Sequence, residues 1–187
     1  MKKITLSLLG LFFFIITLSA QTTIKETFES GLPTSAPSTE TAVTLSTGSW
    51  KLNGTFGKSD NGSNRLAMNT NGYAITPALN KPTSLSFTHR GSGSGKVITV
   101  YKSIDNGANW TSIGTATVGS SSTYAQANMS VSEAGTKNVL LKFVCGSATI
   151  YIDDVTIVCS NMGDEPTTQA SLTATEVTGN SMKINFT

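Results

Sequence analysis

The sequence predicts an all-β protein folded as an antiparallel sandwich of two sheets. From Gln21 onward no convincing 3.6-residue hydrophobic period is present, and only 13% of the 187 residues are charged, which argues against a helical bundle. Turn-forming pairs such as Asn53-Gly54, Asn71-Gly72 and Asn106-Gly107 recur about every ten residues. Between them apolar and polar residues alternate, as around Leu85 and Phe87, which is typical of a sheet with one buried face.

Each predicted strand lies between two turn signals. Many short strands within about 140 residues favour a sandwich closed by two packed sheets. The predicted strands are Thr23–Phe28, Val43–Leu45, Trp50–Leu52, Arg65–Met68, Tyr73–Ile75, Ser84–Thr88, Lys96–Ser103, Thr111–Val118, Tyr124–Val131, Asn138–Cys145 and Tyr151–Cys159.

The first twenty residues have the features of a secretory signal peptide. Lys2-Lys3 forms a short positive region, Ile4–Leu18 is almost wholly apolar, and the small residues Ser19-Ala20 precede Gln21. The apolar run of about 15 residues is shorter than the roughly 20 that span a bilayer as a helix. We therefore expect this segment to be cleaved and the mature protein to be secreted or held at the cell surface. An uncleaved N-terminal anchor is the alternative.

The two cysteines, Cys145 and Cys159, are expected to be free and buried. The segments that carry them look like adjacent strands of a hairpin that turns at Gly146-Ser147. In such a hairpin about ten extended residues, at roughly 3.3 Å each, separate the two positions, which is far beyond disulfide reach. Their spacing also lacks the paired pattern of zinc and redox sites.

The composition changes after Cys159, which divides the chain into domains. Residues 21–159 form the predicted sandwich, and the polar stretch 160–169 is interpreted as a linker. Residues 170–187 alternate around a Gly179-Asn180 turn and resemble the opening two strands of a fibronectin type III domain. The resemblance implies that the chain ends inside an incomplete domain.

The charge balance argues against binding to nucleic acid or to anionic lipid. Lys2 and Lys3 are the only charged residues of the signal segment, so the rest of the chain has 11 basic and 11 acidic residues. A neutral chain without a basic stripe lacks the attraction on which such binding depends.

The common catalytic signatures are missing, and we expect no enzyme within this chain. His89 is the only histidine, and neither G-x-S-x-G nor H-E-x-x-H occurs. The loop Gly91–Lys96 lacks the first glycine and the final Ser or Thr of a phosphate-binding loop. A glycosidase would need only two carboxylates, and this alternative stays open.

The segment from Ser103 to Trp110 resembles an Asp-box, S-x-D-x-G-x-T-W, with Asn109 in place of threonine. Its role is structural: Asp105 can accept hydrogen bonds from turn amides, Gly107 suits a positive φ, and the Trp ring packs below the hairpin. A sugar-stacking role for Trp110 is the functional alternative.

The acidic pair Asp153-Asp154 lies inside an apolar strand, so one carboxylate is expected to point towards the core. A buried carboxylate needs a cation or several hydrogen-bond donors. Calcium, which prefers oxygen ligands, is one solution, and hydrogen bonding of Asp153 to turn amides without metal is the other. The strand around Glu26 and Glu29 could add a second carboxylate if it pairs near the last strand.

Four motifs in order resemble the cleaved-adhesin, or choice-of-anchor J, modules of secreted bacterial proteins, which are similar to MAM domains and galactose-binding-like carbohydrate-binding modules. The motifs span about residues 24–158 and are Thr27–Pro33 (F-E-x-G-x-P), Ala74–Leu79, Val100–Trp110 and Tyr151–Ile157 (Y-I-D-D-V-x-I). The resemblance implies a jelly roll with a structural calcium ion. It also implies Glu29 and Asp153 as metal ligands, with Asp154 as the less favoured one.

We therefore predict a non-catalytic binding or adhesion module that recognises a glycan or an extracellular protein. Tyr73, Tyr101 and Tyr124 are the aromatic candidates for ligand contact. The alternative is the accessory N-terminal region of an extracellular hydrolase or nuclease whose catalytic domain lies beyond residue 187. The sequence predicts neither the ligand nor the oligomeric state.

Overall fold

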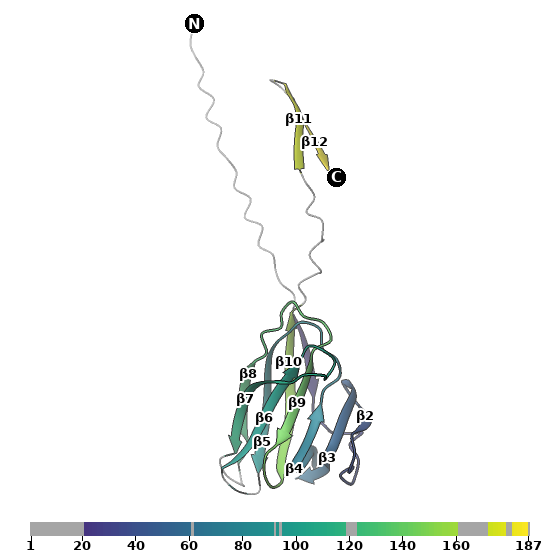
Figure 1. Ribbon diagram of the computed structural model, residues 1–187, viewed down its shortest axis with the longest axis vertical. Coiled ribbons are helices and arrows are strands. Elements are labelled where there is room, and N and C mark those ends of the chain that lie inside the picture. Colours follow the sequence, from purple (N-terminus) through teal and green to yellow (C-terminus); the bar gives the residue numbers. More distant parts are fainter. Residues whose placement is uncertain are drawn as a thin grey trace.

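The computed structural model describes residues 21–60, 62–91, 93, 95–118 and 123–160, and the backbone of 172–178 and 181–186. The described part is all-β, as predicted (Figure 1). It contains no helix long and apolar enough to cross a membrane. The strands of the main domain are β1 Gln21–Glu26, β2 Thr41–Leu45, β3 Gly48–Asp60, β4 Ser63–Ile75, β5 Pro82–Gly91, β6 Lys96–Ser103, β7 Thr111–Val118, β8 Ala125–Ser130, β9 Leu140–Cys145 and β10 Ile150–Ser160.

The ten strands form two layers that are joined through β10. One layer has the order β7-β6-β9-β4-β3-β2, and the other has the order β8-β5-β10-β1, with all pairs antiparallel. The layers connect where Ile150–Ile152 of β10 pairs with Leu66–Met68 of β4. Strand β1 thus pairs with β10, the last strand of the main domain, which is the condition under which a second carboxylate could come near Asp153.

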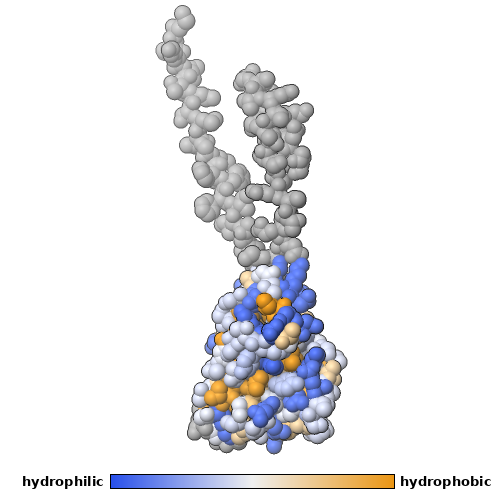
Figure 2. All heavy atoms as spheres, viewed as in Figure 1, coloured by the Kyte–Doolittle hydropathy of each residue, from blue (hydrophilic) through white to orange (hydrophobic). Residues whose placement is uncertain are grey.

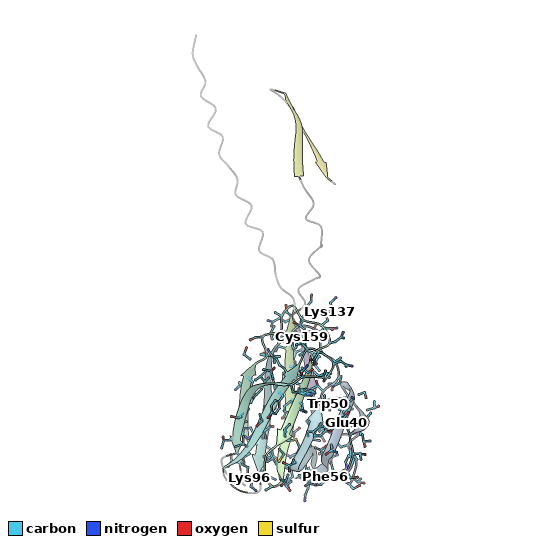
Figure 3. All side chains as sticks on the ribbon, in the orientation of Figure 1. Glu40, Trp50, Phe56, Lys96, Lys137 and Cys159 are labelled. Carbon is cyan, nitrogen blue, oxygen red and sulfur yellow. The ribbon has the colours of Figure 1, made fainter. Side chains whose placement is uncertain are left out.

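The core lies between these layers and is built from aromatic rings. Phe87 of β5 meets Phe143 of β9 edge to face, with ring centroids 5.4 Å apart. Trp50 of β3 stacks on Phe143 at 6.4 Å and contacts Phe28 at 5.5 Å. Figure 3 shows the side chains on the ribbon and labels Trp50. Burial alternates along β5, so the residues between its core positions, such as Ser86, face outward.

Two long strands replace three shorter predicted segments. β3 runs through Asn53-Gly54 and β4 runs through Asn71-Gly72, although both pairs were interpreted as turns. The two glycines face each other, since a Cβ atom on Gly54 would lie 2.9 Å from the Cα atom of Gly72. The register shifts beside this contact. The glycines therefore permit a close approach of two backbones at a bulge and do not end the strands.

The predicted hairpin between the cysteine-bearing strands is wrong. β9 pairs with β4 and β6, whereas β10 pairs with β1, β4 and β5, so the two strands lie in different layers. Both Cys145 and Cys159 are nevertheless free and buried, as expected. Cys145 lies near Lys96, and Figure 3 labels Lys96 and Cys159 at opposite ends of the sandwich.

The C-terminal strands β11 (Leu172–Thr178) and β12 (Ser181–Phe186) form a two-stranded antiparallel sheet, as the alternating pattern predicted. Their assignment to a fibronectin type III domain stays a prediction. The predicted signal segment 1–20 and linker residues 161–169 lie outside the described residues.

Candidate functional site

A row of paired residues crosses the outer face of the larger layer. Lys51 of β3 pairs with Ile75 of β4, Ile75 pairs with Lys142 of β9, and Lys142 pairs with Tyr101 of β6. Their neighbours along each strand, such as Phe143, belong to the core. Because side chains alternate between the faces of a sheet, this row faces away from the core.

This row forms part of a pocket of about 220 Å³ that we call the aromatic pocket. Its polar and aromatic members are Glu40, Lys51, Tyr73, Trp110 and Lys142. Strands β3, β4 and β9 and the turn between β6 and β7 supply most of its lining. The remaining lining residues are Ile75, Asn106, Gly107 and Leu140.

The Asp-box turn places Trp110 beside the pocket. Ser103 Oγ donates to Asp105 Oδ1 (2.7 Å) and accepts from the Gly107 amide (2.8 Å). Asp105 also accepts from the backbone and side-chain amides of Asn109, and these hydrogen bonds lower the pKa of Asp105 to about 2. Gly107 has φ +90°, and a Cβ atom there would contact the Trp110 ring at 3.5 Å.

Lys142 lies among three aromatic rings. Its ammonium nitrogen is 4.2 Å from the centroid of Trp110, 5.7 Å from that of Tyr73 and 5.8 Å from that of Tyr101. These are cation–π distances. Burial lowers the pKa of Lys142, and the nearby Glu40 carboxylate opposes that shift. Among the described residues, the ammonium forms no hydrogen bond or ion pair.

Glu40 connects the other polar groups of the pocket. One of its carboxylate oxygens is 3.1 Å from Lys51 Nζ, and the other accepts a 3.1 Å hydrogen bond from the Tyr73 hydroxyl. Burial and the Glu40 carboxylate raise the pKa of Tyr73. The pocket thus brings together two aromatic rings, two ammonium groups and a carboxylate on the outer face of the sheet.

The structure separates the three predicted ligand-contacting tyrosines. Tyr73 and Tyr101 lie on the face with the aromatic pocket, although Tyr101 does not line that pocket. Tyr124 precedes β8 in the other layer, where the guanidinium groups of Arg65 and Arg90 lie 4.1 and 4.9 Å from its ring centroid. The three residues therefore cannot form one site.

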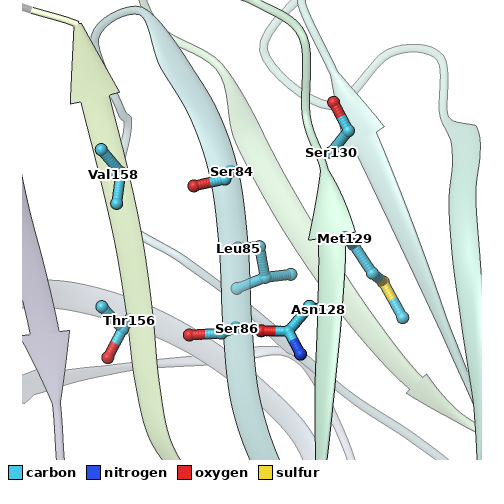
Figure 4. Close-up of a pocket in the computed structure, with 8 residues that line it drawn as sticks. All are labelled: Ser84, Leu85, Ser86, Asn128, Met129, Ser130, Thr156 and Val158. Atoms are coloured by element: carbon cyan, nitrogen blue, oxygen red, sulfur yellow. The ribbon is translucent and has the colours of Figure 1, made fainter.

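The smaller layer carries a shallower depression of about 370 Å³ on β5, β8 and β10 (Figure 4). It is lined mainly by small polar side chains without formal charge: Ser84, Ser86, Asn128, Ser130 and Thr156, with Leu85, Met129 and Val158. Figure 2 shows one face of the molecule as largely polar with scattered hydrophobic spots. This hydroxyl-lined groove has no aromatic ring on which a sugar could stack.

The acidic pair of β10 lies at a bulge. Ile152 and Val155 both belong to the core, and the register shifts between them, with Asp154 at φ +49°. The predicted burial of one carboxylate is confirmed for Asp153, but the bulge places neither acidic residue on the core face of β10. Asp153 pairs with Thr88, on the outer side of its sheet, yet only 5% of it is exposed.

Asp153 and Asp154 differ in their partners. Asp153 accepts a 2.8 Å hydrogen bond from the Asp154 amide and lies 3.3 Å from the guanidinium of Arg65. Burial raises the pKa of Asp153 in spite of these contacts. Asp154 is half exposed and pairs with Lys25 at 3.0 Å. Glu29 is exposed and accepts hydrogen bonds from the Ser63 hydroxyl and the Asn64 amide.

The described side chains around Asp153 do not fit a calcium ion as they are placed. Arg65 occupies one side of the Asp153 carboxylate, and both carboxylate oxygens of Glu29 already accept protein hydrogen bonds. In the part of the chain that the structure describes, no three His, Cys, Asp or Glu side chains gather around a possible metal position. Calcium bound by Glu29, Asp153 and Asp154 stays a prediction.

The sequence reasoning named Glu26 only as a possible second carboxylate beside Glu29 and missed that it is buried at the end of β1. It is 2% exposed and accepts hydrogen bonds from the Phe28 amide, the Ser46 hydroxyl and both the amide and hydroxyl of Thr47, at 2.8 to 3.0 Å. The Thr47 hydroxyl in turn accepts from the Trp50 indole at 2.9 Å. Burial raises the pKa of Glu26, but the hydrogen bonds outweigh it and the pKa is lowered.

Lys142, Lys51 and Glu40 of the aromatic pocket were also missed. Each is an ordinary polar residue in its local sequence, and only the pairing of β2, β3, β4 and β9 brings them together. A usable signal was the lysine between Leu141 and Phe143, which had to face away from the core.

Comparisons with known proteins identify the fold. No protein-family model matches the chain, and no curated protein matches its sequence. The K2 cleaved adhesin domain of Lys-gingipain matches with a TM-score of 0.53 and 18% identity, over 73% of this chain and 99% of that one. The K1 domain of Lys-gingipain from Porphyromonas gingivalis matches with a TM-score of 0.51 and 22% identity, over 73% and 97%.

The main domain has the jelly-roll fold of the cleaved adhesin domains. A mutant of a family 29 carbohydrate-binding module also matches this cleaved-adhesin-like jelly roll, with a TM-score of 0.50 and 12% identity over 74% of this chain and 86% of that one. Low identity means that the fold alone is shared. The function must be argued from the surfaces of this jelly roll.

Proposed function

We propose that this chain is a non-catalytic, glycan-binding module of an exported protein and that the sugar binds in the aromatic pocket. The observation that carries the proposal is the grouping of two ring faces, from Tyr73 and Trp110, with Glu40, Lys51 and Lys142 on an outward sheet face. Sugar rings present apolar C–H faces that pack on aromatic side chains, while their hydroxyls need well-placed polar partners.

The size of the pocket supports a small recognition unit. Its volume of about 220 Å³ is below the roughly 300–1,000 Å³ of most ligand pockets. One sugar unit of a longer chain would therefore enter, and the neighbouring units would lie on the sheet surface outside it. The Asp-box turn supports the site because its internal hydrogen bonds hold Trp110 in place before any ligand arrives.

Other observations support a binding role in an exported protein. The fold is shared with a family 29 carbohydrate-binding module whose ligand recognition has been probed by mutation. The predicted signal segment supports export, and the lack of common catalytic motifs in the sequence supports a non-catalytic role. An extracellular protein as the ligand is the competing possibility, which the experiment below separates.

The test is a glycan array probed with the wild-type protein, followed by affinity measurements on two matched variants. Tyr73→Ala removes a ring from the aromatic pocket, and Tyr124→Ala removes a comparable ring from the other layer. We expect Tyr73→Ala to weaken binding to any hit at least about 10-fold, which corresponds to about 1.4 kcal/mol. Tyr124→Ala should leave the affinity unchanged.

Three outcomes would overturn the proposal. An array without hits, combined with capture of an extracellular protein, would make this an adhesion module for proteins. A loss of binding in Tyr124→Ala but not in Tyr73→Ala would move the site to the other layer. Turnover of a bound glycan would show catalysis. Thermal melting of both variants checks that each loss reflects the site and not unfolding.

A further inference from the structure

The ammonium group of Lys142 has no anionic partner in contact with it. It is surrounded by the rings of Trp110, Tyr73 and Tyr101, and it forms no hydrogen bond or ion pair among the described residues. A lysine ammonium carries three N–H donors. Ring faces attract its charge but cannot accept three directed hydrogen bonds, so the group keeps donor capacity for a ligand.

The one carboxylate of the aromatic pocket does not accept a hydrogen bond from Lys142. Glu40 uses one oxygen for Lys51 at 3.1 Å and the other for the Tyr73 hydroxyl at 3.1 Å. The nearby carboxylate of Asp105 is held by Ser103 and Asn109 within the Asp-box. The charged groups that line the pocket are therefore two ammonium groups and one carboxylate, and the pocket has one uncompensated positive charge.

We propose that the aromatic pocket selects an anionic saccharide and that Lys142 pairs with its acidic group. This inference rests on the proposed glycan-binding function. An ammonium–carboxylate or ammonium–sulfate contact is a charge-assisted hydrogen bond, which is stronger than a contact with a neutral hydroxyl. The partial burial that lowers the pKa of Lys142 reduces solvent screening of that contact.

The other layer provides an internal contrast. The hydroxyl-lined groove on β5, β8 and β10 is lined by serine, threonine, asparagine and apolar side chains without formal charge. A surface of that kind does not distinguish an acidic sugar from a neutral one. Of these two depressions, only the aromatic pocket has a charged lining that can select an acid.

The experiment compares acidic saccharides with neutral forms of the same shape. The probes are short oligogalacturonates and their methyl esters, sialylated and desialylated oligosaccharides, and sulfated and desulfated galactan oligosaccharides. We expect the best acidic probe to bind about 10-fold or more tightly than its neutral counterpart, because a hydrogen bond to a charged group contributes more than a neutral one. Higher salt should reduce this ratio. The sulfated and carboxylated arms identify which acid is preferred.

Lys142→Met keeps the apolar stem over the rings and removes the charge. It should abolish the preference for the acidic probe, so that the acidic and neutral forms bind with equal affinity. Lys137→Met is the control, because it removes the same charge from an exposed position at the end of the sandwich. It should keep the full preference.

Failure of this inference is distinguishable from failure of the proposed function. Binding that is lost in Tyr73→Ala, but is equal for acidic and neutral probes, would overturn the acid selectivity and keep the glycan site. An acid preference that persists in Lys142→Met would also overturn it. No binding to any saccharide would overturn the proposed function itself.

Discussion

Glu26 and Asp153 are two buried carboxylates on the paired strands β1 and β10, and their pKa values are shifted in opposite directions. Glu26 is 2% exposed and Asp153 is 5% exposed. The pKa of Glu26 is lowered, whereas that of Asp153 is raised. Burial raises the pKa in both cases, so burial does not cause the difference. The number of hydrogen-bond donors decides whether a buried carboxylate is stable as an anion.

The donors differ because the two carboxylates meet different local structures. Glu26 points at the tight turn between β2 and β3, where Ser46 and Thr47 offer two hydroxyls and an amide. Asp153 lies at a bulge, where its hydrogen-bond donors are the amide of Asp154 and the more distant guanidinium of Arg65. Glu26 thus locks β1 to the β2–β3 turn, while Asp153 is left with a poorer set of partners.

The largest expected effect is that of Glu26→Ala. It would leave the buried donors of Phe28, Ser46 and Thr47 without their acceptor, and the Trp50 indole contact would lose its support. We expect a loss of about 3–5 kcal/mol in the free energy of unfolding, measured by urea denaturation. Thr47→Ala should cause a smaller part of the same loss. A change below about 1 kcal/mol would mean that the network adds little net stability.

Calcium would give the next largest effect if it binds, and its addition tests the sequence-based prediction of a metal site. If Glu29 and Asp153 bind calcium, a concentration about 100-fold above the dissociation constant should add about 2.7 kcal/mol of stability. Thermal melts with calcium and with chelator measure it. Asp153→Ala should abolish the calcium dependence, whereas Asp154→Ala should largely preserve it. Coincident melting curves for the wild type would leave Arg65 as the cation that compensates Asp153.

Asp153→Asn is expected to have the smallest effect on stability at neutral pH. Its raised pKa means that the folded state disfavours the charged form. The substitution removes that cost, so in chelator we expect a change within about 1 kcal/mol, in the stabilising direction. A loss of several kcal/mol would show instead that the contact with Arg65 outweighs the cost of burial.

The contributions of the two carboxylates to the free energy of unfolding should change with pH in opposite directions. The contribution of Glu26 is present above its ordinary value of 4.5 and is lost as the pH falls through its lowered folded pKa. The cost of Asp153 is absent below its ordinary value of 3.8 and develops as the pH rises through its raised folded pKa. Urea denaturation of wild type, Glu26→Gln and Asp153→Asn from below pH 3.8 up to neutral pH should show both trends.

Much of the fold was predictable because strand patterns are local. Lys96–Ser103 and Thr111–Val118 were predicted with the bounds that β6 and β7 have. The S-x-D-x-G pattern also predicted its own hydrogen bonds, because all its partners lie within a few residues of one another. The Gly54 and Gly72 positions were misinterpreted because a glycine needed for close backbone contact has the same local signature as a glycine in a turn.

The candidate site was less predictable because its parts come from distant strands. Lys142 meets Tyr73 only because β9 lies between β4 and β6, an order that no local pattern contains. The separation of Tyr124 from Tyr73 has the same cause. Tyr124 precedes a strand of the other layer. The local sequence around a surface tyrosine does not show which of the two layers it belongs to.

By itself, the sequence determined the class of fold, most strands, the Asp-box turn and the outward direction of each alternate residue. Hydrophobic alternation and turn chemistry act over a few residues, so they can be read directly from the chain. Tertiary structure alone decided which strands are neighbours, and therefore that Arg65 faces Asp153, that Ser46 and Thr47 face Glu26, and that three rings surround Lys142. These contacts depend on the pairing order of the whole sandwich, because the energy that selects it comes from burial of the entire core.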